Sequence, residues 1–395
     1  MKVYDAQSIR NVALVGHSGS GKTQLVSTLL FDAGAVSRLG RVDEGTTVTD
    51  YDDEEIARKH TLSAALAYAE WNKHKINFID TPGMANFLSD ARAALRVADA
   101  ALVVVDAVAG VEVSTEKVWD VATELGVPRL VALNRLDRER ASLDRSLESL
   151  HAVFGRTVVP VQLPIGEEKN FKGVVDLVTM KAWTFADGKA SEGAIPGDLQ
   201  SAADTARESL IEMVAEADDA LMEKFFDAGT LTQEELIEGL KRGVAAARIF
   251  PLFCVSAAAN IGAQPILDAI VTYAPSPLDR PLKARAGTGD DVEIATSESG
   301  PAAAFVWKSA HSAGAPAFDR RMRAARQRAA PKQMLDTRPR TRRTRALTSN
   351  AGLASVWAAD PRRVPVRERG GQTAVVIPCV LRSAADERQG QSAPR

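Results

Sequence analysis

The sequence contains little cysteine, few aromatic residues and no long apolar run. Its 395 residues include only two cysteines, Cys254 and Cys379, and 5% aromatic residues. The cysteines lie far apart and outside any metal-ligand spacing, so we expect reduced thiols and neither a disulfide nor a zinc site. There is no run of about 18 apolar residues and no charged-then-apolar leader, which argues against a membrane-spanning helix and a secretory signal. We therefore expect a cytoplasmic monomer with no membrane partner and no DNA partner.

The apolar residues that are present suffice for a large core. Hydrophobic residues make up 45% of the chain, and its length allows two or three domains. Apolar, strand-like runs alternate with amphipathic, helix-like stretches. The expected strands are residues 12–15, 76–79, 101–105, 130–133 and 252–255, with helices such as 87–97 and 115–125 between them. This alternation predicts an α/β fold with a doubly wound, mostly parallel sheet, whose ligand lies beyond the carboxyl ends of the strands.

Two parts of the chain depart from this alternation. Residues 62–71 resemble a further strand, for which an antiparallel edge position is one option. Residues 163–246 interrupt the pattern with short strands near 173–184 and charged helices near 199–226 and 232–246. We interpret this interruption as an inserted α+β subdomain.

Four short motifs occur at or near the ends of strand-like runs. They are GHSGSGKT at Gly16 to Thr23, DTPG at Asp80 to Gly83, NRLD at Asn134 to Asp137, and SA at Ser256 and Ala257. The first fits Gly-x-x-x-x-Gly-Lys-Thr and follows an apolar run directly, as in a phosphate-binding loop. Each of the others alone is typical of an ordinary turn or helix cap. In this order, the four together predict a guanine-nucleotide site.

The first motif has the composition of a loop that surrounds phosphate groups. The predicted loop consists of Gly16, His17, Ser18, Gly19, Ser20 and Gly21. Its glycines permit positive φ angles and turn backbone N–H groups inward, at the start of a helix expected to end near residue 34. Lys22 is placed to reach the β- and γ-phosphates, whereas His17 is interpreted as a packed side chain.

Three further residues are expected to handle Mg²⁺ and the γ-phosphate. Thr23 offers a hydroxyl to Mg²⁺, and Asp80 is expected to hold the same ion through water, because Mg²⁺ keeps part of its hydration shell. Gly83 can donate its backbone N–H to the γ-phosphate. These roles predict a GTP or GDP site with a bound Mg²⁺.

The last two motifs are expected to bind the base. Asn134, Arg135, Ser256 and Ala257 flank it, and Asp137 is placed to accept hydrogen bonds from the ring N–H and the amino group of guanine. Adenine cannot supply these donors, so the Asp137 carboxylate would stay unpaired beside ATP, and we expect ATP to be excluded for this reason.

Beyond the motifs, three connecting segments resemble one family. GTTVTDYDDEEIARKHT at residues 45–61, DAVAGVEVSTEKVW at 106–119 and QPILDAIVTYAPSP at 264–277 are similar to the guanine-nucleotide domain of bacterial elongation factor G and its close paralogues. The resemblance covers about residues 10–308. It implies a translational GTPase that hydrolyses GTP to GDP and phosphate, with Mg²⁺ as cofactor and the ribosome as partner. It also implies that the Thr61 hydroxyl joins the Mg²⁺ shell and that the insertion is a subdomain which such factors carry.

Three residues depart from the pattern of this family. Met84 stands where the family has a His that orients the attacking water, and a thioether cannot do this. We therefore expect Thr61 and Gly83 to belong to a catalytic centre that hydrolyses GTP slowly. The alternative is that backbone groups, Mg²⁺ and ribosomal RNA align the water without help from the side chain of Met84. Gly19 stands where Asp is common, which puts a potassium requirement in doubt. Arg135 replaces the usual Lys and can stack its planar guanidinium on the base.

The sequence changes character after Lys308. Residues 309–395 contain 18 basic residues, of which 17 are Arg, against six acidic ones, whereas residues 1–308 contain 31 basic and 45 acidic residues. We expect a GTP-binding domain at 1–280, a linker with the first strand of an incomplete β-barrel at 281–308, and an Arg-rich tail at 309–395 that is disordered or out of frame.

Two interpretations of the tail stay open. One is a basic arm that binds RNA. The other is a frameshifted reading of a GC-rich gene, in which case residues 293–308 would form an unpaired strand with an exposed apolar edge.

The expected function is that of an elongation factor G, with GTP hydrolysis coupled to ribosome translocation or ribosome disassembly. Two alternatives are a non-hydrolysing GTP-binding module, indicated by Met84, and a ribosomal protection factor of the tetracycline-resistance type.

Overall fold

A computed structural model describes residues 4–186 and 188–280, together with short segments at 282–285, 291–294, 307–310, 366–368 and 373–375. The chain divides into two units. One comprises Ser8–Asp279, and the other comprises Met1–Gln7 with Arg280–Arg395.

A mostly parallel sheet forms the centre of the unit Ser8–Asp279. Its strands are β1 (Ile9–Val15), β2 (Ala65–Trp71), β3 (His74–Asp80), β4 (Ala100–Asp106), β5 (Arg129–Asn134), β6 (Val158–Pro160) and β11 (Phe250–Cys254). Their order is β2-β3-β1-β4-β5-β11-β6. Only β2 in this sheet is antiparallel to its neighbour, β3, and it lies at an edge. The predicted α/β fold and the antiparallel edge strand are both confirmed.

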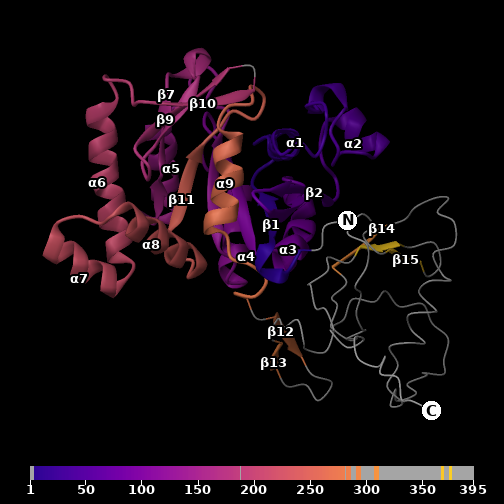
Figure 1. The fold of residues 1–395 in the computed structure, drawn as a ribbon. Coiled ribbons are helices and arrows are strands. Elements are labelled where there is room, and N and C mark those ends of the chain that lie inside the picture. The colour runs from indigo at the N-terminus through magenta and orange to yellow at the C-terminus, as the bar shows by residue number, and fades with distance from the viewer. Residues whose placement is uncertain are drawn as a thin grey trace, which may run out of the picture. The chain divides into compact units, whose positions relative to one another are not determined.

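Helices connect these strands and cover the sheet. They are α1 (Lys22–Asp32), α2 (Asp53–Arg58), α3 (Leu88–Val97), α4 (Val113–Glu124), α5 (Leu143–Phe154) and α9 (Ala263–Tyr273), with short 3₁₀ turns at Ala6–Ser8, Val42–Glu44, Ala85–Phe87 and Glu168–Asn170. Helix α9 packs against α1, and α3 packs against α4 (Figure 1). None of the helices in the described residues combines the length and the apolar character that a membrane crossing needs.

The central strands are buried from end to end. Every residue of β1 and of β4 is buried, as expected for strands with helices on both faces. The side chains of Leu14, Phe78 and Leu102 are among the largest that are fully buried. This core fixes the carboxyl ends of β1, β3, β5 and β11, where the motifs lie.

The inserted subdomain follows β6. It comprises β7 (Gln162–Ile165), β8 (Gly173–Asp176), β9 (Lys181–Ala186), β10 (Lys189–Gly193), α6 (Gln200–Glu216), α7 (Asp219–Ala228) and α8 (Gln233–Ala245). The strands form an antiparallel sheet, and Figure 1 shows α6, α7 and α8 together at one flank of the unit.

One helix expected in the insertion is in fact two. The chain leaves α6 after Glu216, and the Asp218 carboxylate accepts hydrogen bonds from the backbone N–H groups of Ala220 and Leu221 at the start of α7. A short polar side chain that caps a new helix competes with continuation of the old one. The expected helix over residues 199–226 is therefore wrong at this point.

Short strand pairs occur in the second unit. Strand β12 (Leu282–Arg285) pairs antiparallel with β13 (Asp291–Ile294), and β16 (Thr373–Val375) pairs with both β14 (Lys308–Ala310) and β15 (Val366–Glu368). The expectation of an unpaired strand is wrong where residues are described, because Glu293 faces Lys283 and Lys308 faces Val375 in these ladders. Most of the predicted tail lies outside the described residues.

Candidate nucleotide-binding site

The predicted phosphate loop joins β1 to α1. Two of its glycines cannot be replaced without a clash: a Cβ on Gly16 (φ 141°) would lie 2.3 Å from the carbonyl oxygen of Val104, and one on Gly21 (φ 90°) would lie 2.3 Å from Nδ2 of Asn134. Gly19 also has a positive φ, of 82°. Ser18 and Gly19 are accessible at the loop, whereas Ser20 is buried. The loop thus places backbone groups at the N-terminus of α1, as an anion site requires.

Lys22 is buried below this loop. Its Nζ donates to the carbonyl oxygens of Gly16 at 3.0 Å and His17 at 2.7 Å. Burial lowers the pKa of Lys22 to about 8, although the nearby Asp80 carboxylate opposes the shift. Gly83 also lies close to Lys22, since a Cβ on Gly83 would be 2.4 Å from Nζ of Lys22. The DTPG segment and the phosphate loop therefore meet at Lys22.

Asp80 ends β3 in a fully buried position. Its Oδ2 accepts a hydrogen bond of 2.8 Å from the Thr49 hydroxyl, while its Oδ1 is buried without a hydrogen bond to a described residue. Burial raises the pKa of Asp80 to about 6, and the hydrogen bond from the Thr49 hydroxyl acts in the opposite direction.

Two threonine hydroxyls adjoin this carboxylate. Oγ1 of Thr23 lies 2.8 Å from Oγ1 of Thr61, which in turn donates to Oδ1 of Asp50 at 2.8 Å. Because Thr61 has only one hydroxyl proton, Thr23 is the donor between the two threonines. Carboxylate and hydroxyl oxygens are suitable ligands for Mg²⁺, and Oδ1 of Asp80, which has no hydrogen bond to a described residue, is an atom that a cation would satisfy. The residues present are compatible with the ion that the family resemblance implies.

The segment before Thr61 is held by its own side chains. Asp52 and Glu55 form a capping box on α2, and the buried Glu55 accepts hydrogen bonds from the backbone N–H groups of Leu62 and Ser63 at 2.9 and 3.1 Å. Sequence reasoning missed Thr49, Asp50 and Glu55, since none belongs to a nucleotide motif. These contacts place Thr61 beside Thr23.

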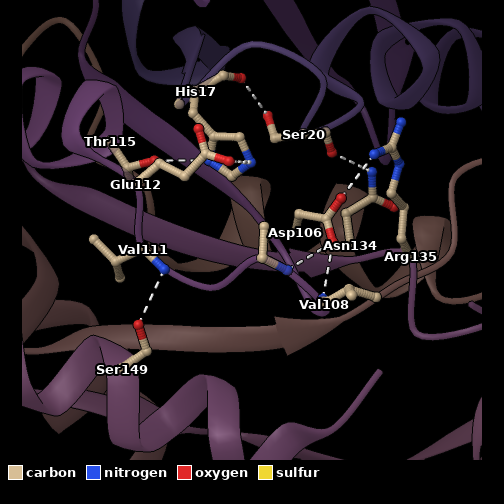
Figure 2. Close-up of polar contacts among 12 residues, drawn as sticks. His17, Ser20, Asp106, Val108, Val111, Glu112, Thr115, Asn134, Arg135 and Ser149 are labelled. Carbon is tan, nitrogen blue, oxygen red and sulfur yellow. Dashed lines mark hydrogen bonds and ion pairs between the residues drawn. The ribbon is translucent and has the colours of Figure 1, made fainter. Parts of the chain in front are cut away.

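Asn134 connects three of the four motifs. Its Nδ2 donates to the carbonyl oxygen of Ser20 at 2.8 Å (Figure 2), and its Oδ1 accepts from the backbone N–H of Ala257 at 3.0 Å. Ser256 is buried, and its backbone pairs with that of Ile261. The phosphate loop, the NRLD segment and the SA segment are thus joined through one amide side chain.

Arg135 is fixed by an ion pair. Its Nη1 lies 2.7 Å from Oδ2 of Asp106, the last residue of β4 (Figure 2), and Oδ1 of Asp106 accepts from the backbone of Val108 and Ala109. Burial has the largest single effect and raises the pKa of Asp106, but the hydrogen bond and charge of Arg135, together with the backbone N–H groups of Val108 and Ala109, outweigh it and the pKa is lowered. Sequence reasoning missed Asp106, although its position at a strand end matches that of Asp80. Asp137 lies partly buried in the same loop as Arg135.

His17 is a packed residue in the structure, as predicted. Its Nδ1 lies 2.9 Å from Oγ1 of Thr115 and its Nε2 lies 3.9 Å from Glu112 (Figure 2). Burial lowers the pKa of His17, with Glu112 opposing the shift. The imidazole therefore supports the loop from the side of α4.

Met84 follows the DTPG segment at the surface. It precedes the 3₁₀ turn Ala85–Phe87, is 39% exposed, and makes no side-chain capping hydrogen bond. A thioether is only a weak hydrogen-bond acceptor, so this side chain cannot hold a water in the way that an imidazole can. The structure brings all four motifs together, while the role of each residue in them stays a prediction.

Known proteins are similar to this chain in sequence and in fold. Residues 7–276 match the family described as the elongation factor Tu GTP binding domain. The elongation factors G of Thermotoga neapolitana and Thermotoga petrophila are 39% identical to the chain over 309 residues, which are 77% of this chain and 44% of each relative. A crystal structure of a protein from Thermus thermophilus has a TM-score of 0.69 and 35% identity, and the match covers 78% of this chain and 44% of that one. The chain spans less than half the length of these relatives.

Proposed function

Because the chain belongs to the elongation factor G family of translational GTPases, we propose that it binds GTP and GDP at this site and hydrolyses GTP when bound to a ribosome. The observation that carries the proposal is the double hydrogen bond of Asn134, to Ser20 and to Ala257. This amide joins the loop expected to bind phosphate to the loop expected to bind guanine. In the cell, hydrolysis would serve translocation or ribosome disassembly by a cytoplasmic monomer.

The residues around Lys22 would bind the phosphates. Backbone N–H groups of the loop from Gly16 to Gly21 and the ammonium group of Lys22 would bind the phosphates, and Gly83 would donate its N–H to the γ-phosphate. Thr23, Thr61 and Asp80 would hold Mg²⁺, which supplies positive charge to the phosphate oxygens during transfer. Asp80 must be ionised for this role, and its pKa of about 6 leaves it ionised at pH 7.

The residues around Asn134 would bind the base. Asp137 would accept hydrogen bonds from the guanine ring N–H and amino group, Arg135 would cover the face of the base, and Ser256 with Ala257 would line its edge. The ion pair with Asp106 keeps the Arg135 guanidinium in one orientation, which suits stacking on a flat ring.

A second candidate function is a GTP-binding module that hydrolyses GTP slowly. The specific observation in its favour is the exposed thioether of Met84 at the place where the family resemblance implies a catalytic His. In that case the chain would still bind GTP tightly and release phosphate slowly, even with ribosomes.

The proposal is tested by nucleotide selectivity. We expect the full chain to bind GDP and GTP at least about 1,000-fold more tightly than ADP and ATP, because adenine leaves the Asp137 carboxylate unpaired. An Asp137→Asn variant should lose affinity for GDP and gain affinity for xanthosine diphosphate, whose C2 carbonyl accepts from an amide. Asp144→Asn, at an exposed position in α5, is the matched control. Equal affinity for guanine and adenine nucleotides would overturn the proposal.

A further inference from the structure

A residue outside every motif contacts the carboxylate expected at the Mg²⁺ site. Thr49 lies in the segment of residues 40–63 between α1 and β2, and its hydroxyl donates to Oδ2 of Asp80 at 2.8 Å. The exposed fractions of Thr49 and Asp80 are 1% and 0%. A hydrogen bond between a buried hydroxyl and a buried carboxylate is strong because water does not compete for either group.

This hydrogen bond leaves the two oxygens of Asp80 in different situations. Oδ2 is occupied by Thr49, whereas Oδ1 is buried without a hydrogen bond to a described residue. A carboxylate held through one oxygen cannot rotate freely, so the other oxygen keeps a fixed direction. Groups that orient a metal-binding carboxylate in this way commonly determine how tightly the metal binds.

The same segment makes a second contact with the site. Thr61 lies 2.8 Å from Thr23 and donates to Asp50, the residue after Thr49, at 2.8 Å. The segment 40–63 therefore contacts both sides of the site, Asp80 at the end of β3 through Thr49 and Thr23 at the start of α1 through Thr61. If this segment moves away, both contacts are lost together.

We infer that Thr49 is a positioning residue for Mg²⁺: its hydroxyl orients Asp80 and thereby makes retention of the ion depend on the closed position of residues 40–63. The inference rests on the proposed function, since it assigns a further residue to the same nucleotide site.

The same segment offers a matched control. Thr47 is buried, and its hydroxyl has no hydrogen bond to a described residue. Thr47→Val therefore removes a hydroxyl from the same loop without removing a hydrogen bond to a described residue. Thr49→Val removes the bond to Asp80 at nearly constant volume, and Thr49→Ser keeps the hydroxyl as a rescue variant.

The test measures release of a fluorescent GDP from the full chain over a series of Mg²⁺ concentrations. For Thr49→Val we expect the Mg²⁺ concentration that half-suppresses release to rise about tenfold, as is typical when a partner of a metal ligand is lost. Thr49→Ser and Thr47→Val should match the unmodified chain. Binding of Mn²⁺ to the GDP complex, followed by electron paramagnetic resonance, should weaken by the same factor. Thermal melting verifies that each variant is folded, and Thr49→Ala replaces Thr49→Val if that variant is not.

The outcomes separate the inference from the proposed function. An unchanged Mg²⁺ dependence in Thr49→Val, or an equal change in Thr47→Val, would overturn the inference while leaving guanine-nucleotide binding intact. If the unmodified chain binds no guanine nucleotide, the proposed function fails and the inference fails with it.

Discussion

At the residue scale, Met84 is the position where this chain departs most from what its family resemblance implies. We expect Met84→His to raise ribosome-stimulated GTP turnover by about 100-fold, since a positioned imidazole can orient or polarise the attacking water and a thioether cannot. The side chain is partly exposed and makes no capping bond, so the replacement should fit without disturbing the fold. Phosphate release with purified ribosomes is the measurement.

The affinity for GDP should not change in this variant, because Met84 does not belong to the residues expected to bind phosphate or guanine. Met84→Leu, which keeps the size and lacks the imidazole, should behave as the unmodified chain does. Equal turnover of the His and Leu variants would show that backbone groups and the ribosome align the water without this side chain.

Sequence reasoning located the residues of local motifs but missed those that act through distant contacts. Lys22, Asp80 and Asn134 could be predicted because fixed spacings and strand ends mark them. Thr49 could not, since its partner Asp80 is 31 positions away and only folding brings the hydroxyl and the carboxylate together. Asp106 could have been predicted, because an acidic residue directly after the apolar residues of a buried strand marks a strand end, as Asp80 does.

At the scale of elements, the C-terminal end of α1 is tied to the loop after β11. Asp32, the last residue of α1, accepts a hydrogen bond of 2.8 Å from Nδ2 of Asn260. Burial raises the pKa of Asp32 to about 6, although this hydrogen bond opposes the shift. A negative charge at a helix C-terminus is also unfavourable. The ionised form of Asp32 therefore destabilises the folded protein.

The expected consequence is a pH-dependent gain from Asp32→Asn. Since the pKa in the folded state lies above the ordinary value of 3.8, ionisation costs folding free energy, and this cost grows as the pH rises from about 4 to about 6. The amide keeps the acceptor for Asn260 and removes the charge. At pH 7.5 we expect about 1 kcal/mol of stabilisation, reduced because the side chain is partly solvated, or roughly 2–4 °C in Tm.

The gain should shrink by pH 5 and vanish near pH 4, as seen by thermal melting across this range. Asp227→Asn, at an exposed site in α7, is the control and should leave Tm unchanged. A constant gain at every pH would mean that charge on Asp32 is not the cause.

The elements themselves could be predicted to within a few residues where the hydrophobic pattern is long. Strand β4 was expected at residues 101–105 and spans Ala100–Asp106. The break between α6 and α7 could not be predicted in the same way, because the hydrophobic pattern does not mark it; in the structure, Asp218 caps the start of α7 there. The pairing of β12 with β13 was also not predicted, because the hydrophobic pattern of a strand does not identify the strand with which it pairs.

At the scale of the whole molecule, the predicted site lies within one unit. Every residue expected to bind nucleotide or Mg²⁺ falls between Ser8 and Asp279, while the Arg-rich residues 309–395 fall in the other unit. Both interpretations of that tail, an RNA-binding arm or a frameshifted reading, stay predictions, because nearly all of it lies outside the described residues. We therefore expect nucleotide binding to be the same whichever of them is correct.

A chain that ends at Arg280 should therefore bind GDP with a Kd within about twofold of that of the full chain, since the apolar core that fixes the motifs is retained. A chain that ends at Gly262 should not fold, because it lacks α9, whose Ile266, Leu267 and Ile270 are fully buried. Each such side chain contributes about 2–5 kcal/mol, so the loss of all three is comparable to the roughly 5–15 kcal/mol that stabilises a typical domain. Titration with a fluorescent GDP and thermal melting of both chains provide the measurement. Loss of GDP binding in the chain that ends at Arg280 would mean that residues of the second unit complete the site.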